Sequence, residues 1–233
     1  MKKKIKRIHD SLYLKENRYK KTKESFKLLI NILKKKINSK KRYSVIDVGC
    51  SNGELIYQLE KHFKNFEITG LDIRSDLINK AKQNVSDKIK FIKKDIFKRQ
   101  EFKKYDIVIC SGVISIADNP KEFCNNLLKL KKRDGLIYLF HHFNSFDYNV
   151  YVKYQDLKNP NYLQSGWNIF SLSYLSKLFK RKKIKYYRFN SKKNILQNKK
   201  DFVRSWSIKI NKKNFFTNGL MLILDQYWIE IKN

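Results

Sequence analysis

The sequence predicts an α/β fold, a doubly wound and mostly parallel sheet in a single domain. A β-branched run from Ser44 to Val48 leads through a glycine-containing turn into a helical pattern over residues 53–63. Strand and helix patterns then alternate along the chain, which is typical of a parallel sheet with helices on both faces. A length of 233 residues is enough for one such domain with a substantial core.

The turn after the first strand has the composition of a nucleotide-type site. It reads Asp47-Val48-Gly49-Cys50-Ser51-Asn52-Gly53. Glycines let the backbone approach a ligand closely, and free N–H groups at the start of the next helix favour an anionic group. A second strand ends in Asp72, 19 residues after Gly53, where an acid is placed to accept hydrogen bonds from ribose hydroxyls.

Two other kinds of site also contain a glycine turn, and each is an alternative interpretation of this stretch. The dinucleotide fingerprint G-x-G-x-x-G does not fit, because the spacing here is Gly49, Ser51, Gly53. The stretch also matches the G-x-S-x-G nucleophile elbow of α/β-hydrolases. An elbow normally follows several strands, however, and no strand is apparent before this turn. The hydrolase interpretation also leaves Asp47 and Asp72 without a role, so it is the weaker one.

The pattern D-V-G-C-S-N-G resembles motif I of class I S-adenosylmethionine-dependent methyltransferases, and Asp72 matches their acidic motif II. The resemblance runs from about Val45 to Phe143 and resumes after Ser171. It implies a Rossmann-like sheet of seven strands, with an antiparallel last strand inserted between strands five and six. The last segment, residues 220–231, has a length and apolar spacing that also fit a helix.

The resemblance implies S-adenosylmethionine as the cofactor and assigns roles to its contacts. Asp47 would order the ammonium side of the methionine moiety and Asp72 the ribose. Asp95, after the third strand, would face the adenine amino group, and Ser111 and Gly112 would flank the sulfonium. The residues expected to bind the cofactor are Asp47, Gly49, Cys50, Ser51, Gly53, Asp72, Ile73, Asp95, Ile96, Ser111 and Gly112.

The segment after the fourth strand differs from the corresponding segment in two groups of this family. Methyltransferases that modify base amino groups carry D/N-P-P-aromatic here, whereas this chain has Cys110-Ser111-Gly112-Val113. Many small-molecule members carry Leu-Glu-His shortly afterwards, whereas this chain has Ile114-Ser115-Ile116. The histidine that those relatives place beside the cofactor is therefore missing.

A pair of histidines, His141 and His142, follows the fifth predicted strand, residues 136–140. Ligands bind at the carboxyl ends of strands in open α/β sheets, so the pair lies where an acceptor is expected. Histidine titrates near neutrality and can take a proton from an acceptor hydroxyl. We therefore predict that His141 or His142 is catalytic. The alternative has one histidine capping the strand and the other in solvent.

Two regions are expected to contact the substrate. Residues 1–42 precede the methyltransferase domain, 43–233, and are predicted to form a helical lid or cap. Residues 144–170 interrupt the alternation of strands and helices and are rich in aromatic residues, which suit sugars and other polar rings. The predicted substrate contacts are Tyr13, Arg18, Asn144, Tyr148 and Trp167.

Composition limits the partners and the compartment. The formal charge of +32 favours nucleic acid or an anionic membrane, but a coding bias toward lysine explains much of it. Three scattered cysteines predict neither a disulfide framework nor a metal site and are typical of the cytoplasm. No apolar run reaches the length of a membrane span or a signal peptide. Nothing in the sequence defines the oligomeric state.

The sequence therefore predicts a cytoplasmic S-adenosylmethionine-dependent methyltransferase. Its expected acceptor is a small polar molecule, a sugar or nucleotide-sugar of glycan biosynthesis, because the insertion is aromatic and polar. An RNA methyltransferase is the alternative enzyme, favoured by the charge but not by the segment after strand four. A non-catalytic cofactor-binding protein is the third class.

Overall fold

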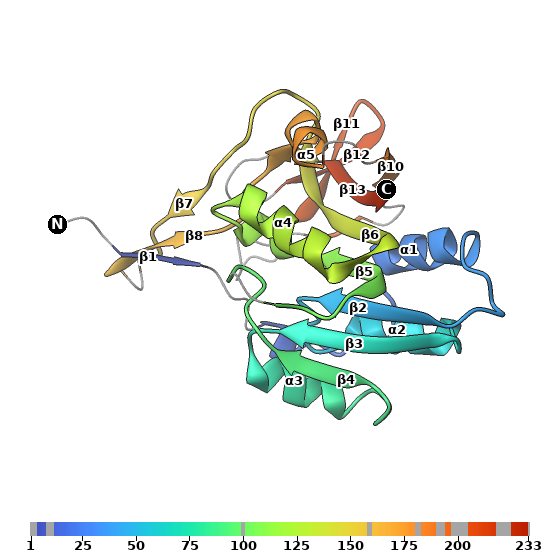
Figure 1. Cartoon of the computed structure of the whole chain (residues 1–233). Coiled ribbons are helices and arrows are strands. Elements are labelled where there is room, and N and C mark those ends of the chain that lie inside the picture. The colour runs from blue at the N-terminus through green and yellow to red at the C-terminus, as the bar shows by residue number, and fades with distance from the viewer. Residues whose placement is uncertain are drawn as a thin grey trace.

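The structure is a computed structural model of the whole chain, shown in Figure 1. It describes the residues numbered 4–7, 12–98, 101–157, 160–179, 183–189, 194–196, 205–217 and 225–232. Among these residues, no helix has the length and apolarity needed to cross a membrane.

An eight-stranded sheet forms the centre of the molecule, with the strand order β10-β13-β6-β5-β2-β3-β4 and a short strand β9 beside β6. Its neighbouring strands run parallel except at β13, which is antiparallel to both β6 and β10. This confirms the predicted mostly parallel, doubly wound sheet. The strands are β2 (Tyr43–Val48), β3 (Phe66–Asp72), β4 (Lys90–Lys93), β5 (Tyr105–Ser111), β6 (Lys131–Asn144), β9 (Phe170–Ser171), β10 (Lys183–Phe189) and β13 (Asp225–Lys232).

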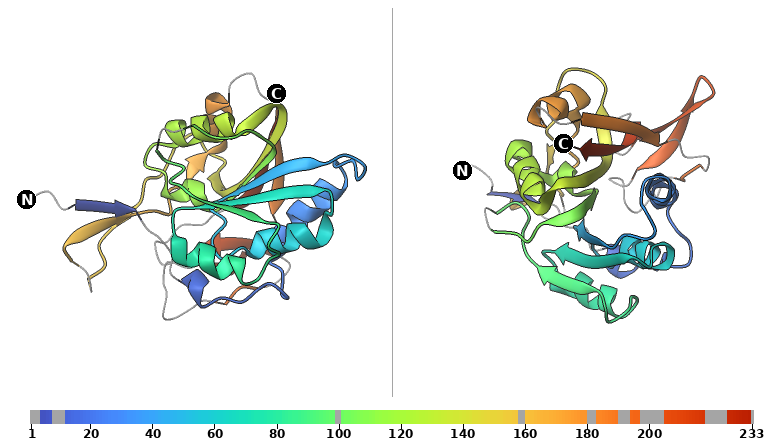
Figure 2. Two further views of the ribbon diagram at one scale, coloured as in Figure 1. Left: turned by 60° about the horizontal axis from the view of Figure 1, so that its bottom comes forward. Right: turned by 45° about the vertical axis from the view of Figure 1, so that its right-hand side comes forward.

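Helices cover both faces of this sheet, so its central strands are buried on both sides (Figures 1 and 2). Val45 and Ile107 pack toward α1 and α2, whereas Ile46 and Val108 pack toward α4 and α5. This alternation explains why the strands read as continuous apolar runs. The helices are α1 (Glu24–Lys34), α2 (Glu54–His62), α3 (Ser75–Lys82), η2 (Val113–Ile116), α4 (Pro120–Leu130) and α5 (Leu172–Leu178).

The last segment is a strand and not a helix. β13 lies between β6 and β10, and Tyr227 pairs with His141 in its register. Trp228 is fully buried and donates its indole N–H to the carbonyl of Ser25 at 2.8 Å. Residues 220–224 of the predicted segment lie outside the described residues.

The N-terminal region contains less helix than expected. A strand, β1 (Lys4–Arg7), and a short 3-10 helix, η1 (Leu12–Leu14), precede α1. No sequence pattern predicts β1, because it pairs with β8 (Tyr162–Ser165), a strand far away in the sequence. Together with β7 (Lys153–Tyr154) these strands form a small sheet that projects from the main body (Figures 1 and 2).

The predicted insertion, 144–170, therefore contributes two of the three strands of this projecting sheet. A separate hairpin, β11 (Trp206–Ile210) and β12 (Lys213–Thr217), lies between β10 and β13 in the sequence. Both are additions to the central sheet. The division into a cap and a methyltransferase domain remains a prediction.

Candidate functional site

The turn between β2 and α2 is shaped by three residues with positive φ angles, Gly49 at 73°, Ser51 at 52° and Gly53 at 81°. A Cβ atom on Gly49 would lie 2.2 Å from Val113 Cγ2, and one on Gly53 would lie 2.9 Å from the Cβ of Ala81. Both positions thus need glycine for conformation and for space. The resulting turn brings backbone N–H groups to the carboxyl end of β2.

Asp72 binds this turn. One carboxylate oxygen accepts a hydrogen bond from Ser51 N at 2.8 Å and the other from Arg74 N at 2.9 Å. The carboxylate is buried but still has lone pairs available, since each oxygen can accept more than one bond. Asp72 therefore holds the glycine turn in place, a role that the sequence does not indicate. Its contact with a ribose stays a prediction.

Asp47 is buried at the end of β2. Burial, followed by the negative charge of nearby Asp72, raises the pKa of its carboxyl to about 7. The same surroundings raise the pKa of the Cys50 thiol well above its ordinary value, mainly through burial and then through both acids. A cationic ligand beside the two acids would therefore favour the ionised form of Asp47.

Asp95 follows β4. The residue before it, Lys94, donates its backbone N–H to the carbonyl of Asp72 at 3.0 Å, which joins the end of β4 to the end of β3. It accepts a hydrogen bond from Phe97 N at 2.9 Å and lies 3.7 Å from a guanidinium nitrogen of Arg7. Arg7 comes from β1 and stacks 4.1 Å above the ring of Phe97. Ile96 is buried, whereas Ile73 is 39% exposed.

The turn after β5 leaves open space. Gly112 has a φ of 90°, and apart from its two chain neighbours no atom of the described residues lies within 4 Å of the position its Cβ would take. Its backbone N–H donates to Phe140 O at 2.9 Å, and its carbonyl accepts the Ser115 hydroxyl at 2.8 Å. Ser111 and Gly112 thus form an open backbone surface held between β5 and β6.

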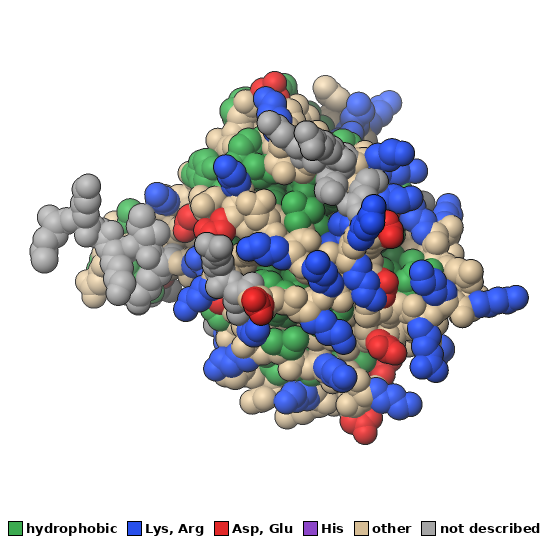
Figure 3. Space-filling model, in the orientation of Figure 1, with side chains coloured by type: hydrophobic (Ala, Val, Ile, Leu, Met, Phe, Trp, Pro, Cys, Tyr) green, Lys and Arg blue, Asp and Glu red, His purple; other side chains and the backbone are tan. Residues whose placement is uncertain are grey.

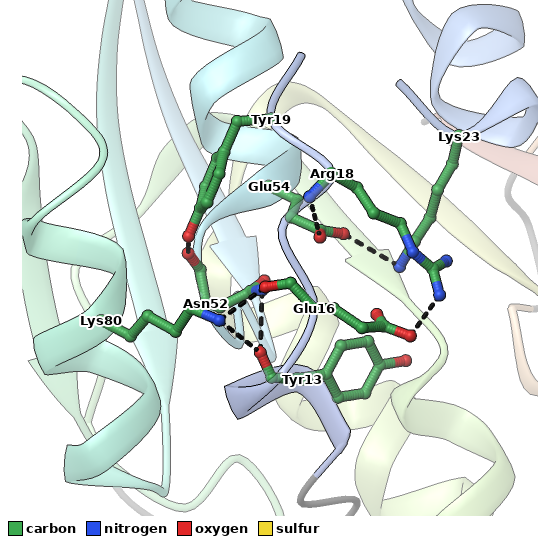
Figure 4. Close-up of polar contacts among 8 residues, drawn as sticks. All are labelled: Tyr13, Glu16, Arg18, Tyr19, Lys23, Asn52, Glu54 and Lys80. Atoms are coloured by element: carbon green, nitrogen blue, oxygen red, sulfur yellow. Dashed lines mark hydrogen bonds and ion pairs between the residues drawn. The ribbon is translucent and has the colours of Figure 1, made fainter. Parts of the chain in front are cut away.

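An N-terminal strap, residues 13–23, lies against the glycine turn (Figure 4). The Asn52 side chain donates to Tyr13 O at 3.0 Å, and the Tyr19 hydroxyl donates to Asn52 O at 2.6 Å. From α3, the ammonium of Lys80 donates to three strap carbonyls, those of Tyr13, Leu14 and Glu16. The strap is therefore fixed to both the turn and the helix after β3.

Glu54, the first residue of α2, is the second anchor of the strap. It is buried, accepts a hydrogen bond from Arg18 N at 3.0 Å, and lies 3.2 Å from Lys23 Nζ. The Arg18 guanidinium pairs with Glu16, and Tyr19 is buried with a pKa raised to about 12 by burial and then by Glu54. No sequence pattern marks Asn52, Glu54 or Lys80 as an anchor, because each acts on a segment more than 30 residues away.

The two histidines of β6 are both buried, so the alternative with one of them in solvent is wrong. Their Nδ1 atoms lie 3.2 Å apart, and His142 Nε2 has no hydrogen-bond partner within the described part of the chain. Burial lowers the pKa of His141 to about 4 and that of His142 well below its ordinary value, in the latter case with a contribution from His141. Both imidazoles are therefore neutral at pH 7.

The predicted substrate contacts in the insertion lie in different surroundings. Asn144 supports a turn, donating to Tyr148 O at 3.1 Å and accepting from Phe146 N at 2.9 Å. Tyr148 is 59% exposed and stacks on Phe146 with a centroid distance of 6.1 Å. Trp167 lies in the loop before β9, beside Asn168, whose backbone N–H donates to Ser115 O at 2.8 Å. The loop of Trp167 is thus attached to the segment after Gly112.

These residues fit an S-adenosylmethionine molecule at the carboxyl ends of β2 to β5. The Ser51 hydroxyl is buried in the glycine turn without a partner among the described residues, which suits a ligand carboxylate. The open space above Gly112 suits the sulfonium, and the acids Asp47 and Asp72 suit the cationic and ribose parts of the molecule.

Solved structures share the fold. Coclaurine N-methyltransferase, bound to N-methylheliamine and SAH, aligns with a TM-score of 0.59 and 15% identity over 78% of this chain and 59% of that one. The N-methyltransferase NodS from Bradyrhizobium japonicum WM9, in complex with S-adenosyl-L-homocysteine, aligns with a TM-score of 0.57 and 12% identity over 97% and 93%. Likenesses at this identity establish the fold alone.

Two curated relatives match in sequence. Malonyl-(acyl-carrier protein) O-methyltransferase 2 of Ilyobacter polytropus is 30% identical over 146 residues, 60% of this chain and 54% of that protein. Ubiquinone biosynthesis O-methyltransferase of Rickettsia bellii is 30% identical over 111 residues, 46% of this chain and 45% of that protein. The chain thus spans about half the length of these relatives.

The model of a methyltransferase domain family matches residues 39–159, just over half of the chain. This match covers the glycine turn, Asp47, Asp72, Asp95 and the turn after β5. It overturns the hydrolase alternative. The chain therefore belongs to the methyltransferase domain family, and its fold is that of the class I S-adenosylmethionine-dependent methyltransferases.

Proposed function

We propose that the protein transfers a methyl group from S-adenosylmethionine to an oxygen atom of a small acceptor. The observation that carries this proposal is the convergence of the glycine turn, Asp72, Asp95 and the open Gly112 surface at one edge of the sheet. Oxygen is favoured as the acceptor atom because the two curated relatives above are named O-methyltransferases.

The site residues have separate roles in this proposal. S-adenosylmethionine supplies an electrophilic methyl group on its sulfonium. Asp72 and Asp95 hold the ribose and adenine, and the Ser51 hydroxyl, which has no partner among the described residues, binds the methionine carboxylate. Ser111 and Gly112 leave the path to the methyl open. Alignment of this kind can contribute roughly 7–11 kcal/mol to lowering a barrier.

The neutral histidines favour a carboxylate as the acceptor. A hydroxyl must lose its proton as it is methylated, and a base with the pKa of about 4 that His141 has takes that proton poorly at neutral pH. A carboxylate has no proton to lose. A hydroxyl acceptor with His141 or His142 as the base is the alternative. The expectation of a sugar or nucleotide-sugar gains no support from the relatives.

The experiment combines binding with turnover. Calorimetry should give one S-adenosylmethionine per chain and no binding of NAD. Protein incubated with methyl-labelled cofactor should then label a malonyl thioester, a carboxylate acceptor, in preference to a nucleotide-sugar. Tight NAD binding without a response to S-adenosylmethionine contradicts the cofactor, and labelling of the sugar alone contradicts the carboxylate.

An RNA acceptor is the second candidate, because the formal charge of the chain is +32. Lysine and arginine side chains are spread over the face in Figure 3 and are not gathered into one stripe. Filter binding to RNA at several salt concentrations tests this candidate. A steep loss of affinity with salt, together with labelling of the RNA, would favour it over the small acceptor.

A further inference from the structure

Trp167 has an unusual backbone conformation. Its φ is 64°, in the left-handed region that bulky side chains rarely adopt. Such a conformation persists only where the surrounding structure enforces it, and strained residues of this kind concentrate at ligand sites. The strain therefore suggests a functional role for the Trp167 side chain in the loop between β8 and β9.

The residues on either side of Trp167 hold the loop in place. Asn168 is buried, and it donates its backbone N–H to Ser115 O at 2.8 Å and its side-chain amide to Ala117 O at 3.0 Å. Its side-chain oxygen accepts Val152 N at 2.8 Å. On the other side, Ser165 donates to the carboxylate of Asp118 at 2.5 Å. The loop is thus clamped onto residues 115–118, directly after the open Gly112 surface.

The indole N–H of Trp167 is buried and has no hydrogen-bond partner within the described ranges. An indole nitrogen can only donate, and leaving a buried donor unpaired is unfavourable. Trp228 offers a direct contrast, because its indole N–H donates to Ser25 O. Strain and an unpaired donor therefore coincide on one residue, beside the segment that leads from the cofactor site.

We infer that Trp167 orients the acceptor by donating its indole N–H to an acceptor oxygen. This inference rests on the proposed function. In a carboxylate acceptor, one oxygen binds the indole while the other faces the methyl group. A donor-only contact of this kind selects molecules that offer a lone pair at that position, and it disfavours ammonium groups and other groups that can only donate.

The test compares Trp167→Phe, which keeps an aromatic ring but removes the donor, with Trp228→Phe. Trp167→Phe should leave the melting temperature of the cofactor-free protein unchanged or raised, because an unpaired donor is lost. Trp228→Phe should lower it by several degrees, because a buried hydrogen bond is lost. An equal loss in both variants would mean that the Trp167 donor already has a partner, and would overturn the inference.

Turnover with a malonyl thioester gives the second measurement. Trp167→Phe should raise KM for the thioester at least tenfold while the dissociation constant of S-adenosylmethionine stays constant. Asn168→Ala should raise KM in the same direction, because the loop loses its clamp. Trp228→Phe should leave KM unchanged. An unchanged KM in Trp167→Phe would overturn the inference while leaving the methyltransferase function intact.

A third measurement separates failure of the inference from failure of the carboxylate acceptor. Protein carrying ¹⁵N-labelled tryptophan and saturated with S-adenosylhomocysteine is titrated with malonate and with a nucleotide-sugar. The indole resonance that Trp167→Phe removes should move with malonate. If the thioester is not methylated but this resonance moves with either compound, the carboxylate acceptor is wrong, whereas the role of Trp167 in binding the acceptor stands. If the resonance moves with neither, the inference is overturned.

Discussion

The cofactor side and the acceptor side of the molecule are held together in different ways. On the cofactor side, glycines and backbone N–H groups define the turn, and Asp72 binds that turn through Ser51 N. On the acceptor side, the loop of Trp167 is held by side chains such as Asn168 that reach more than 50 residues back to Ala117. The first arrangement joins residues 21 apart in the sequence, and the second joins residues 51 apart.

The two sides also differ in how their polar groups are satisfied. Asp72 already has two backbone donors, so the cofactor would join an existing network. In contrast, His142 Nε2 and Trp167 Nε1 have no partner in the described residues. The Ser51 hydroxyl is the exception on the cofactor side, since it too is buried without a partner among the described residues. The difference therefore lies in Asp72, whose hydrogen bonds exist before any ligand is bound.

The largest effect is expected for Gly49→Ala, on the cofactor side. The positive φ costs about 1–2 kcal/mol in an alanine, and the clash with Val113 adds about 1–3 kcal/mol. Gly112→Ala is the matched control, because its φ is also positive but the added Cβ would have no described residue other than its chain neighbours within 4 Å. Denaturant unfolding should show a greater loss of stability for Gly49→Ala. Equal losses would mean that the turn does not pack as described.

The carboxyl of Asp47 should make stability depend on pH. Its pKa is raised from 3.8 to about 7 in the folded chain, so between these values the unfolded chain releases a proton that the folded chain keeps. The free energy of unfolding of the cofactor-free protein should therefore fall, by a few kcal/mol, as pH rises through this window. Asp47→Asn should flatten the dependence, and an identical pH profile in that variant would contradict the assignment.

The affinity for S-adenosylmethionine should show the opposite trend, because a cationic ligand favours the ionised carboxylate. Calorimetry between pH 5.5 and 8 checks this, with Asp47→Asn as the control. Affinity that falls with rising pH would place the cationic part of the cofactor elsewhere.

Asp72→Ala should weaken cofactor binding by at least tenfold, since charge-assisted hydrogen bonds are worth about 1.5–3 kcal/mol each. Because Asp72 also accepts hydrogen bonds from Ser51 N and Arg74 N, its loss should lower stability as well. Asp76→Ala, at an exposed residue four positions on, is the control for calorimetry and unfolding. An unchanged dissociation constant in Asp72→Ala would place the ribose elsewhere.

Lys80→Met should have a smaller effect, a loss of cofactor affinity of roughly threefold to tenfold, as expected for losing about one net hydrogen bond. Lys80 holds three strap carbonyls against the glycine turn, so its loss should speed cofactor release more than it slows binding. Stopped-flow measurements of both rates test this, with the exposed Lys82→Met as the control. Equal release rates in the two variants would mean that the strap does not restrain the cofactor.

The smallest effect is expected for His141→Ala and His142→Ala on a carboxylate acceptor, where turnover should change by less than about tenfold. With a hydroxyl acceptor, loss of a general base lowers turnover by about 10²–10⁴-fold. In that case the wild-type rate should fall only as pH drops toward about 4, the pKa of His141. The pH profile of turnover for each acceptor therefore decides between the two roles.

The sequence by itself determined the α/β class, the glycine turn and the acids at the ends of strands. These features depend on short-range patterns, because alternating apolar residues, turn glycines and a strand-terminal acid act within a few residues. It also predicted an antiparallel last strand, but only through resemblance. The apolar spacing of residues 220–231 suited a helix equally well, and pairing of β13 with β6 and β10 settled it.

Only the tertiary structure decided how the site is held and what surrounds its polar groups. Lys80 is one of 53 lysines and arginines, and nothing local distinguishes it until α3 lies beside the strap. The low pKa values of His141 and His142 arise from burial, partly beside β13, a strand far along the chain. The loop of Trp167 is likewise held by Asn168, which binds residues after β5. Such contacts join segments far apart in sequence, so no short pattern encodes them.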